Sequence, residues 1–253
     1  MTELKSKTKA QLLTTSTATI TTQLFRRGLR NTFLQGVRPL GRYSGNMVGP
    51  AFTLRYIPAR EDLDSYNSKR DPNALQREAI ESVPPGHVLV MDCRGDARAA
   101  SAGDVYVTRL QVRGVAGVVS DGGVRDSGPI SAMEFPVYCA GPSAPTYRTL
   151  HHAIDCGLPI ACGSVAVYPG DIVVGDADGV AVIPQDIVDE VARDAAEQEA
   201  LEKFILSRVA GGEKLPGLYP VNERTRQEYA DWVEQNRKTN GSSNTAADGI
   251  PLK

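Results

Sequence analysis

The sequence contains few of the residues that usually build metal and redox centres. Only three of its 253 residues are histidine. Its four cysteines (Cys93, Cys139, Cys156 and Cys162) form no CxxC pair and no zinc-like spacing. Scattered thiols of this kind are typical of reduced cysteines in a cytoplasmic protein. A metal site in this chain would therefore depend mainly on carboxylates and water.

Long apolar runs and excess charge of one sign are absent as well. No stretch approaches the roughly 18 consecutive apolar residues of a membrane span, and the lysine-containing N-terminus lacks the continuous apolar segment of a signal peptide. The 28 Lys and Arg residues nearly balance the 30 Asp and Glu residues, which argues against a basic nucleic-acid-binding face. We therefore expect a cytoplasmic protein that binds neither nucleic acid nor a membrane.

The middle of the chain alternates between short apolar runs and segments of helical character. Residues 87–93, 114–120 and 136–140 are predicted strands, and residues 104–114 and 129–135 are the helices predicted between them. This alternation predicts parallel βαβ units whose sheet is covered on both faces. The sequence thus indicates one α/β domain with a mixed or parallel central sheet.

The flanking segments carry clear start, stop and turn signals. Thr14, Ser16 and Thr17 are the candidates to cap a helix that Gly28 ends. A strand with an edge or bulge is expected at 47–59, a loop at 60–74 and hairpins at 158–184. Helices are expected at 74–83, 148–157 and 185–209. The tail is expected to contain an amphipathic stretch around Tyr229, in which Trp232 anchors it. About fifteen residues at the C-terminus are expected to be loosely attached.

The richest cluster of polar residues spans positions 103–126. Asp104 opens a predicted helix, while Arg125 and Asp126 close a Gly-rich loop after a predicted buried strand. Open α/β sheets place ligands at such strand ends. Two carboxylates suit Mg²⁺, and the planar guanidinium of Arg125 suits an anion. A plain turn with a structural Arg125–Asp126 ion pair would also explain the pattern, so spacing alone leaves both interpretations open.

The segment GDVYVTRLQVRGVAGVVSDGGVRD at 103–126 resembles the signature of the RraA-like family. That family is named after a regulator of ribonuclease E activity. It also includes class II aldolases that cleave 4-hydroxy-4-methyl-2-oxoglutarate or 4-carboxy-4-hydroxy-2-oxoadipate. Further matches are STAT at 16–19, PPGHVLVMD at 84–92 and YPGDIVVGDADGVAVIP at 168–184.

The resemblance implies a fold and an assembly. It implies an RraA-like domain of the swivelling type, an αββα sandwich, over residues 1–209, followed by a C-terminal helical extension over 210–253. Members of the family form homotrimers or homohexamers with sites at subunit boundaries, so a homo-oligomer is expected here.

The resemblance also implies roles for the polar residues. Asp126 would bind a divalent metal, Mg²⁺ or Mn²⁺ or another, and Asp104 would act through the water shell of that metal and orient a water that acts as the acid. Arg125 would hold the pyruvyl part of the substrate and stabilise the enolate. Gly103 and the backbone N–H groups of Val105 and Tyr106 would hold a substrate carboxylate.

A glutamate from a neighbouring subunit's C-terminal helix would complete the water shell of the metal. Glu199 is the best match by resemblance, with Glu197 and Glu202 as alternatives. The pair Val105-Tyr106, the loop at 60–74 and the C-terminal tail depart from the family pattern, and all three lie where substrate choice could be set.

The function implied is a class II pyruvate aldolase, a metal-dependent carbon–carbon lyase. It would cleave a 4-hydroxy-2-oxo acid to pyruvate, with oxaloacetate decarboxylation as a side activity. The alternatives are a non-catalytic regulator that binds a ribonuclease, and a related metal-enolate hydrolase of a dioxo sugar acid. The presence of Asp126 favours a working metal site, because the ribonuclease regulator lacks the final Asp of the Arg-Asp pair.

Overall fold

The computed structural model describes residues 4–64 and 74–242, and the chain divides into two compact units, Met1–Ala196 and Glu197–Lys253. The division falls inside helix α7 (Val188–Ala210), whereas the sequence-based division at residue 209 falls at the end of that helix. Within the described ranges, no helix is both long and apolar enough to cross a membrane.

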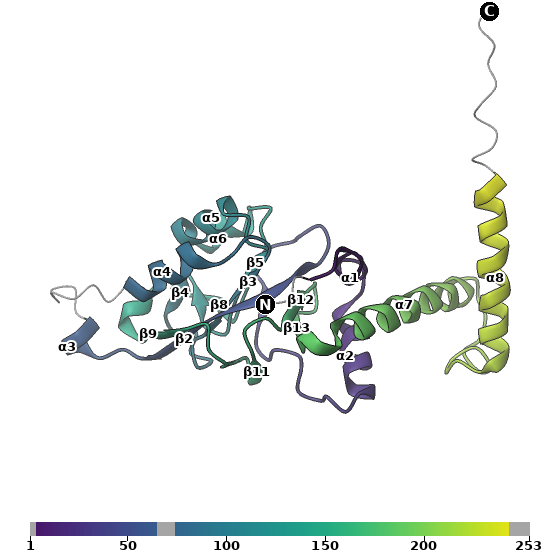
Figure 1. Ribbon diagram of the computed structural model, residues 1–253, viewed down its shortest axis with the longest axis horizontal. Coiled ribbons are helices and arrows are strands. Elements are labelled where there is room, and N and C mark those ends of the chain that lie inside the picture. The colour runs from purple at the N-terminus through teal and green to yellow at the C-terminus, as the bar shows by residue number, and fades with distance from the viewer. Residues whose placement is uncertain (1–3, 65–73, 243–253) are drawn as a thin grey trace, which may run out of the picture. The chain divides into compact units, whose positions relative to one another are not determined.

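The first unit is built on an eight-stranded mixed sheet (Figure 1). Strands β2, β3, β5 and β7 run parallel, and the others pair antiparallel. In spatial order the strands are β1 (Arg38–Pro39), β7 (Val137–Cys139), β5 (Gly117–Ser120), β3 (Val88–Asp92), β2 (Met47–Pro58), β12 (Ile172–Gly175) and β13 (Val180–Ile183), with β9 (His151–Cys156) also paired to β2. The predicted α/β class with a mixed sheet is confirmed.

Alternating side chains of the parallel strands build two separate cores. Leu89 and Met91 face helices α4 (Ala74–Ser82), α5 (Asp104–Val112) and α6 (Ser127–Ser131), which lie together on one side of the sheet (Figure 1). Val88 and Val90 face the opposite way, toward the hairpin of β10 (Ile160–Cys162) and β11 (Val165–Val167). Both faces of β3 are therefore buried, as its uninterrupted apolar run predicts.

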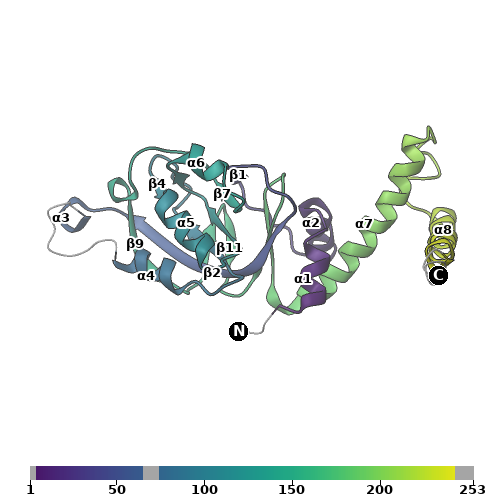
Figure 2. The same cartoon turned by 90° about the horizontal axis from the view of Figure 1, so that it is seen from above.

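Helices cover the β12–β13 end of the sheet. Helix α1 (Ser6–Leu12), helix α2 (Thr17–Arg26) and the first part of α7 pack their apolar residues against this hairpin (Figure 2). The predicted cap of α2 is confirmed, because Ser16 Oγ accepts a hydrogen bond from the Thr19 N–H at 3.1 Å. Asp176 adds a second cap, since its carboxylate accepts from the N–H of Thr17 at 2.7 Å and from its hydroxyl at 2.8 Å.

Replacing Asp176 with alanine is expected to lower the free energy of unfolding by about 2 kcal/mol, because charged hydrogen bonds to Thr17 are lost at a buried helix start. Chemical denaturation measures this change. Asp176→Asn is the matched control, because it keeps one carbonyl oxygen as an acceptor and should lose less. An unchanged midpoint for the alanine variant would show that the cap contributes nothing.

Two local predictions differ from the structure, and a third is confirmed. Residues 151–156 form strand β9 rather than a helix, because His151 and Ala153 point inward while Ile154 is exposed, which is the period of a strand. The prediction of an edge or a bulge at 47–59 is confirmed by an irregularity of strand β2 between Arg55 and Tyr56, and β2 lies inside the sheet. The predicted loop at 60–74 includes a short helix, α3 (Glu61–Asp64).

Other predictions of secondary structure are confirmed. The hairpins predicted at 158–184 are present as β10–β11 and β12–β13, and the helix predicted at 185–209 is present as α7 after the short turn η2 (Gln185–Ile187). The four cysteines are free thiols. Residues 65–73 and the last eleven residues, on which a loop and a loose end are predicted, lie outside the described part of the chain.

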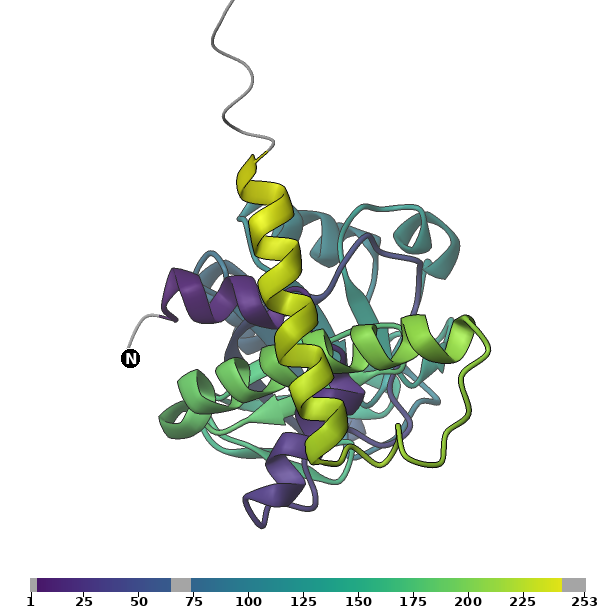
Figure 3. The same cartoon turned by 90° about the vertical axis from the view of Figure 1, so that its right-hand side faces the viewer.

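The second unit contains the end of α7 and helix α8 (Glu223–Ser242), which runs across it (Figure 3). Its small core contains Phe204, Ile205 and Leu218. Trp232 and Tyr229 pack against Phe204, with ring centroids 5.6 and 5.7 Å from it. The prediction that Trp232 anchors the tail is confirmed by these contacts.

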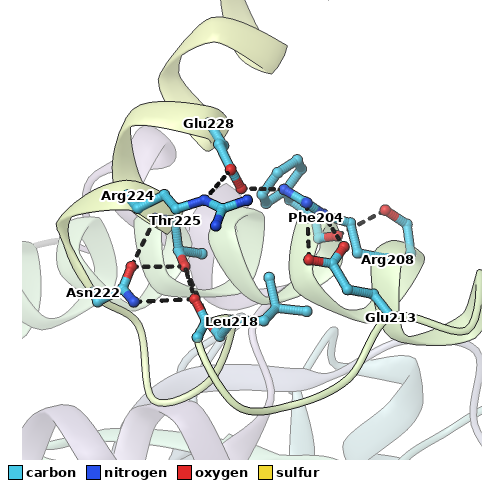
Figure 4. Close-up of polar contacts among 10 residues, drawn as sticks. Phe204, Arg208, Glu213, Leu218, Asn222, Arg224, Thr225 and Glu228 are labelled. Carbon is cyan, nitrogen blue, oxygen red and sulfur yellow. Dashed lines mark hydrogen bonds and ion pairs between the residues drawn. The ribbon is translucent and has the colours of Figure 1, made fainter.

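Charged contacts link the two helices of this unit (Figure 4). Arg208 on α7 forms ion pairs with Glu213 and with Glu228 of α8, and Arg224 lies 2.8 Å from the same Glu228. Asn222 caps α8, since its side-chain oxygen accepts from the Thr225 N–H at 2.9 Å (Figure 4). A few aromatic contacts and one arginine network thus fix α8 on the end of α7.

Candidate active site

A second, very small sheet brings the predicted site residues together. Strands β4 (Ala100–Ala102), β6 (Gly123–Val124) and β8 (Gly141–Pro142) are parallel neighbours in that order. Gly103 and Asp104 follow β4 directly, and Arg125 and Asp126 follow β6. Because neighbouring parallel strands end at the same edge, segments 22 positions apart meet there, and the Arg125 N–H donates to the Ala102 carbonyl at 3.0 Å.

Gly103 allows the segments after β4 and β6 to approach each other closely, because it has no side chain. A Cβ atom at this position would lie 2.7 Å from Asp126 Oδ2 and 2.9 Å from Arg125 Nε, both closer than atoms normally approach. Its backbone (φ −133°, ψ −177°) is extended, so the glycine is needed for space and not for conformation. The side chains of Arg125 and Asp126 therefore lie close against the backbone of Gly103, and the role of Gly103 in holding substrate stays a prediction.

Asp126 has an unusual backbone and a favourable setting for a negative charge. Its φ of +56° and ψ of +37° are left-handed, a conformation that Asp and Asn adopt more readily than most residues. Its Oδ2 lies 3.3 Å from Arg125 Nε and makes a long contact of 3.5 Å with the Asp104 N–H at the start of α5. Both the guanidinium and the helix N-terminus stabilise a carboxylate here.

Asp104 begins α5 and bonds to its own helix. Its Oδ1 accepts from the Val105 N–H at 2.7 Å. A substrate carboxylate that used the N–H of Val105, as the resemblance implies, would have to displace this contact. The Val105 side chain is 72% exposed, whereas Tyr106 is half-buried and packs against the core under the site.

A cavity of about 220 Å³ adjoins these residues. Gly103, Asp104, Val105, Tyr106 and Arg125 line one part of it. The side chains of Arg125 and Asp126 are 48% and 39% exposed, so solvent and small ligands reach both. This volume is below the roughly 300–1,000 Å³ of pockets for drug-sized molecules, which suits a small acid.

Two polar residues far from the motif at 103–126 also line the cavity. Tyr147 and Arg148, in the turn η1 (Tyr147–Thr149), line it beside Thr146. A parallel bridge between Ala100 and Thr146 holds this turn against β4. The two bridged residues are more than forty positions apart, so no local sequence pattern predicts this contact.

The polar residues Asp92 and Asp96, which follow strand β3 or end it, have structural contacts and do not line the cavity. Asp92 accepts hydrogen bonds from the N–H groups of Arg94 and Ala161 at 2.9 and 3.2 Å. Asp96 pairs with Arg98, and this guanidinium lowers the pKa of Asp96. Asp92 and Asp96 therefore stabilise the loop after β3 and form no part of the cavity wall.

The two adjacent histidines are held by polar neighbours. His151 is fully buried, and burial together with Arg94, whose Nη2 lies 3.1 Å from Nδ1, lowers its pKa. His152 Nδ1 lies 2.6 Å from Asp64 Oδ1. Burial raises the pKa of the Cys93 and Cys162 thiols, which disfavours a nucleophilic thiolate. The cavity is therefore lined by oxygen and guanidinium groups rather than by His or Cys.

The predicted glutamates lie on α7 in the second unit. Glu197 is exposed, Glu199 is half-buried, and Glu202 accepts a hydrogen bond from Gln198 at 2.8 Å. The proposed contribution of Glu199 to the metal shell of a neighbouring subunit stays a prediction. Among the described residues, no group of three or more His, Cys, Asp or Glu side chains could hold a metal ion.

Known proteins resemble this chain over the site and beyond it. A protein of Halalkalibacterium halodurans named "Putative 4-hydroxy-4-methyl-2-oxoglutarate aldolase" is 32% identical over 177 residues, which cover 68% of this chain and 78% of that protein. Protein DlpA of Legionella pneumophila is 26% identical over 231 residues, or 90% of this chain, but the match spans only 35% of its own length. That share of the chain exceeds the predicted domain of 209 residues, so the likeness extends into the C-terminal segment.

The fold recurs in a solved structure. Streptomyces coelicolor RraAS2, described as an unusual member of the RNase ES inhibitor RraA protein family, superposes with a TM-score of 0.71 at 30% identity. The superposition covers 81% of this chain and 98% of that one. The family model described as RraA-like, Aldolase/RraA, matches residues 17–182, which include every residue that lines the cavity. The chain therefore belongs to the RraA-like family, as the motif at 103–126 indicates.

Proposed function

We propose that the protein is a divalent-metal-dependent lyase that cleaves a 4-hydroxy-2-oxo acid by a retro-aldol reaction and releases pyruvate. The observation that carries the proposal is the meeting of Asp104, Arg125 and Asp126 beside one small cavity. The likeness to a relative named as an aldolase supports the same reaction class.

The donor set fits a hard cation. Carboxylates are preferred ligands of Mg²⁺, which commonly binds through one or two of them and keeps several waters. Asp126 would hold the metal, Mg²⁺ or Mn²⁺, and Asp104 would contact its water shell. The 39% exposure of the Asp126 side chain leaves room for that water. When bound, the cation supplies Lewis acidity toward the 2-oxo group.

Arg125 and Asp104 have separate tasks in the reaction. The Arg125 guanidinium presents a planar fork to the 2-oxo acid and stabilises the negative charge that develops on the enolate oxygen. The 4-hydroxyl group passes its proton to water as the C3–C4 bond breaks, and the electron pair of that bond forms the enolate. Asp104 orients the water that returns a proton to C3, which completes pyruvate with no net change in protons.

Oxaloacetate decarboxylation follows from the same residues, because loss of CO₂ also leaves the enolate of pyruvate. We further propose that the protein acts in the cytoplasm as a homotrimer or homohexamer. Its partner is a small 2-oxo acid substrate, and we propose that it binds neither nucleic acid nor a membrane.

The decisive experiment is a pyruvate-release assay over a panel of 4-hydroxy-2-oxo acids, with Mg²⁺ and with EDTA. We expect turnover of at least one acid, a loss of about 10²-fold or more in EDTA, and recovery on adding Mg²⁺. Failure to cleave every acid, or turnover that EDTA leaves untouched, would rule out the proposed reaction.

A second candidate is a non-catalytic regulator that binds a ribonuclease, which the likeness to RraAS2 favours. This function requires no metal and should survive the substitution Asp126→Ala. Inhibition of a ribonuclease by that variant, in the presence of EDTA, would support the regulator over the lyase.

A further inference from the structure

Strand β4 contains one more residue than its pairing with β6 requires. The register of the two strands shifts at Ser101. Before the shift, the Gly123 N–H donates to the Ala99 carbonyl at 3.2 Å. After the shift, the Arg125 N–H donates to the Ala102 carbonyl at 3.0 Å. Donors two residues apart on β6 therefore meet carbonyls three residues apart on β4, which is a β-bulge.

The bulge determines where the start of helix α5 lies. In an unbroken parallel ladder the Arg125 N–H would bond to the Ser101 carbonyl, one residue earlier in β4. Asp104 would then lie one residue, about 3.3 Å, farther along the strand direction from Arg125. The Asp104 N–H could not keep its contact at 3.5 Å with Asp126 Oδ2. The extra residue therefore brings Asp104 to Asp126, as bulges beside active sites commonly redirect side chains.

The hydroxyl group of Ser101 ties the bulge to the neighbouring strand. Ser101 is fully buried, and its Oγ donates to the Gly123 carbonyl of β6 at 2.9 Å. The same Oγ lies 2.8 Å from Ser120 Oγ, which accepts from the Gly122 N–H at 3.0 Å. The bulged residue is therefore bonded through its side chain to β6 and to the segment that leads into it.

The carbonyl that the bulge removes from the ladder has its partner on helix α4. Gln76 is fully buried, and its Nε2 donates to the Ser101 carbonyl at 2.5 Å. The Oε1 of Gln76 is buried and has no hydrogen-bond partner among the residues that the structure describes. A buried amide oxygen without a partner is unfavourable, and an apolar side chain of the same length would avoid that cost. The bond to Ser101 therefore gives the physical reason for a glutamine at this position.

On the basis of the lyase function proposed above, we propose that Gln76 and Ser101 are positioning residues that hold the bulge and so place Asp104 beside Asp126. Gln76 does not line the cavity, so it acts only through Ser101. Arg125 and Asp126 follow β6, and their binding of the acid and of the metal does not depend on the bulge. The bulge acts on proton transfer, because Asp104 orients the water that returns a proton to C3.

The variant Gln76→Met tests this role, because methionine keeps the length of the side chain and removes its N–H donor. We expect kcat for pyruvate release to fall about 10²-fold, since a displacement of about 1 Å at a reacting group can have this effect. KM for the 2-oxo acid, and the Mg²⁺ affinity from calorimetric titration, should stay within about twofold of wild type. The thermal midpoint should also stay close to wild type, because methionine removes the unpaired Oε1 together with the donor.

The variant Gln76→Glu keeps the shape of the side chain and provides a rescue. Its carboxylate cannot donate to the Ser101 carbonyl, whereas the protonated acid can, and a contact of 2.5 Å suits an O–H donor. Burial favours the protonated form of a carboxyl group. We therefore expect the ratio of its kcat to the wild-type kcat to rise as the pH falls, while the ratio for Gln76→Met stays constant with pH.

Two further substitutions separate the bulge from the loss of any buried hydrogen bond. Ser101→Ala removes the bond to the Gly123 carbonyl and should lower kcat about tenfold with KM unchanged. Thr53→Val is the matched control. The Thr53 hydroxyl donates to the Leu158 carbonyl at 2.7 Å, and Thr53 is fully buried in β2, outside the cavity lining. This variant should keep the wild-type kcat.

The outcomes distinguish the positioning role from the lyase function. If wild-type protein releases pyruvate and Gln76→Met keeps its kcat, the positioning role is wrong and the lyase proposal stands. A higher KM or a weaker Mg²⁺ affinity in place of a lower kcat would also overturn the role, because the bulge would then act on Arg125 or Asp126. If Gln76→Met does not fold, a kcat ratio for Gln76→Glu that does not vary with pH overturns it instead. If wild-type protein cleaves no 4-hydroxy-2-oxo acid, both proposals fail.

Discussion

Replacing Asp126 with asparagine is expected to lower kcat for pyruvate release by about 10³-fold or more, because the direct carboxylate ligand of the metal is lost. Loss of one negative charge also leaves the guanidinium of Arg125 without its contact at 3.3 Å. The measurement is steady-state pyruvate release at saturating Mg²⁺, together with calorimetric titration of Mg²⁺ into the protein.

Asparagine is chosen because of the backbone at this position. The φ of +56° is left-handed, and Asn tolerates it, whereas alanine would add strain to the lost charge. The free energy of unfolding should therefore change by less than about 1 kcal/mol. Asp178→Asn, in an exposed turn outside the cavity lining, is the matched control and should keep wild-type kinetics. A wild-type rate for Asp126→Asn would remove this residue from the reaction.

The main sheet could be predicted because its signals are local. The run HVLVMDC is apolar on both strand faces, and the structure buries both faces of β3. The small sheet beneath the site could not be predicted in the same way. Strands β4 and β6 span three and two residues, too few to display any period, and they are recognised only through their pairing.

The helix predicted at 148–157 shows how a local pattern can mislead. Leu150, Ala153, Ile154 and Gly157 have helical spacing, yet the structure pairs residues 151–156 with β2. Antiparallel pairing to β2 supplies backbone hydrogen bonds to β9 and buries His151, so tertiary contacts outweigh intrinsic propensity. The predicted helix also concealed η1, because it includes Arg148 and Thr149 of that turn.

The site illustrates the same division between local and long-range information. Asp104, Arg125 and Asp126 could be proposed from the motif at 103–126, since each follows an expected strand or opens an expected helix. Tyr147 and Arg148 reach the cavity through the bridge between Ala100 and Thr146, for which no local signal exists. Their position depends on how β4 lies beside a turn more than forty residues later.

Replacing Gly103 with alanine is expected to lower kcat/KM by about 10²-fold without unfolding the protein, because a displacement of about 1 Å at a reacting group can have this effect. The new Cβ would lie 2.7 Å from Asp126 Oδ2 and 2.9 Å from Arg125 Nε. Both are atoms of side chains, which can move, and the extended backbone of Gly103 accepts alanine. The substitution therefore displaces two functional groups while removing neither.

The matched control is Gly128→Ala, since a Cβ at Gly128 would meet nothing within 4 Å. Kinetics then identify which group moved. Displacement of Asp126 should raise the Mg²⁺ concentration needed for half-maximal rate, whereas displacement of Arg125 should raise KM for the 2-oxo acid. If Gly103→Ala keeps the wild-type Mg²⁺ requirement and the wild-type KM, neither Asp126 nor Arg125 acts from its position in this structure. Because the alanine removes no catalytic group, a loss of rate would show that activity depends on where the Arg125 and Asp126 side chains lie.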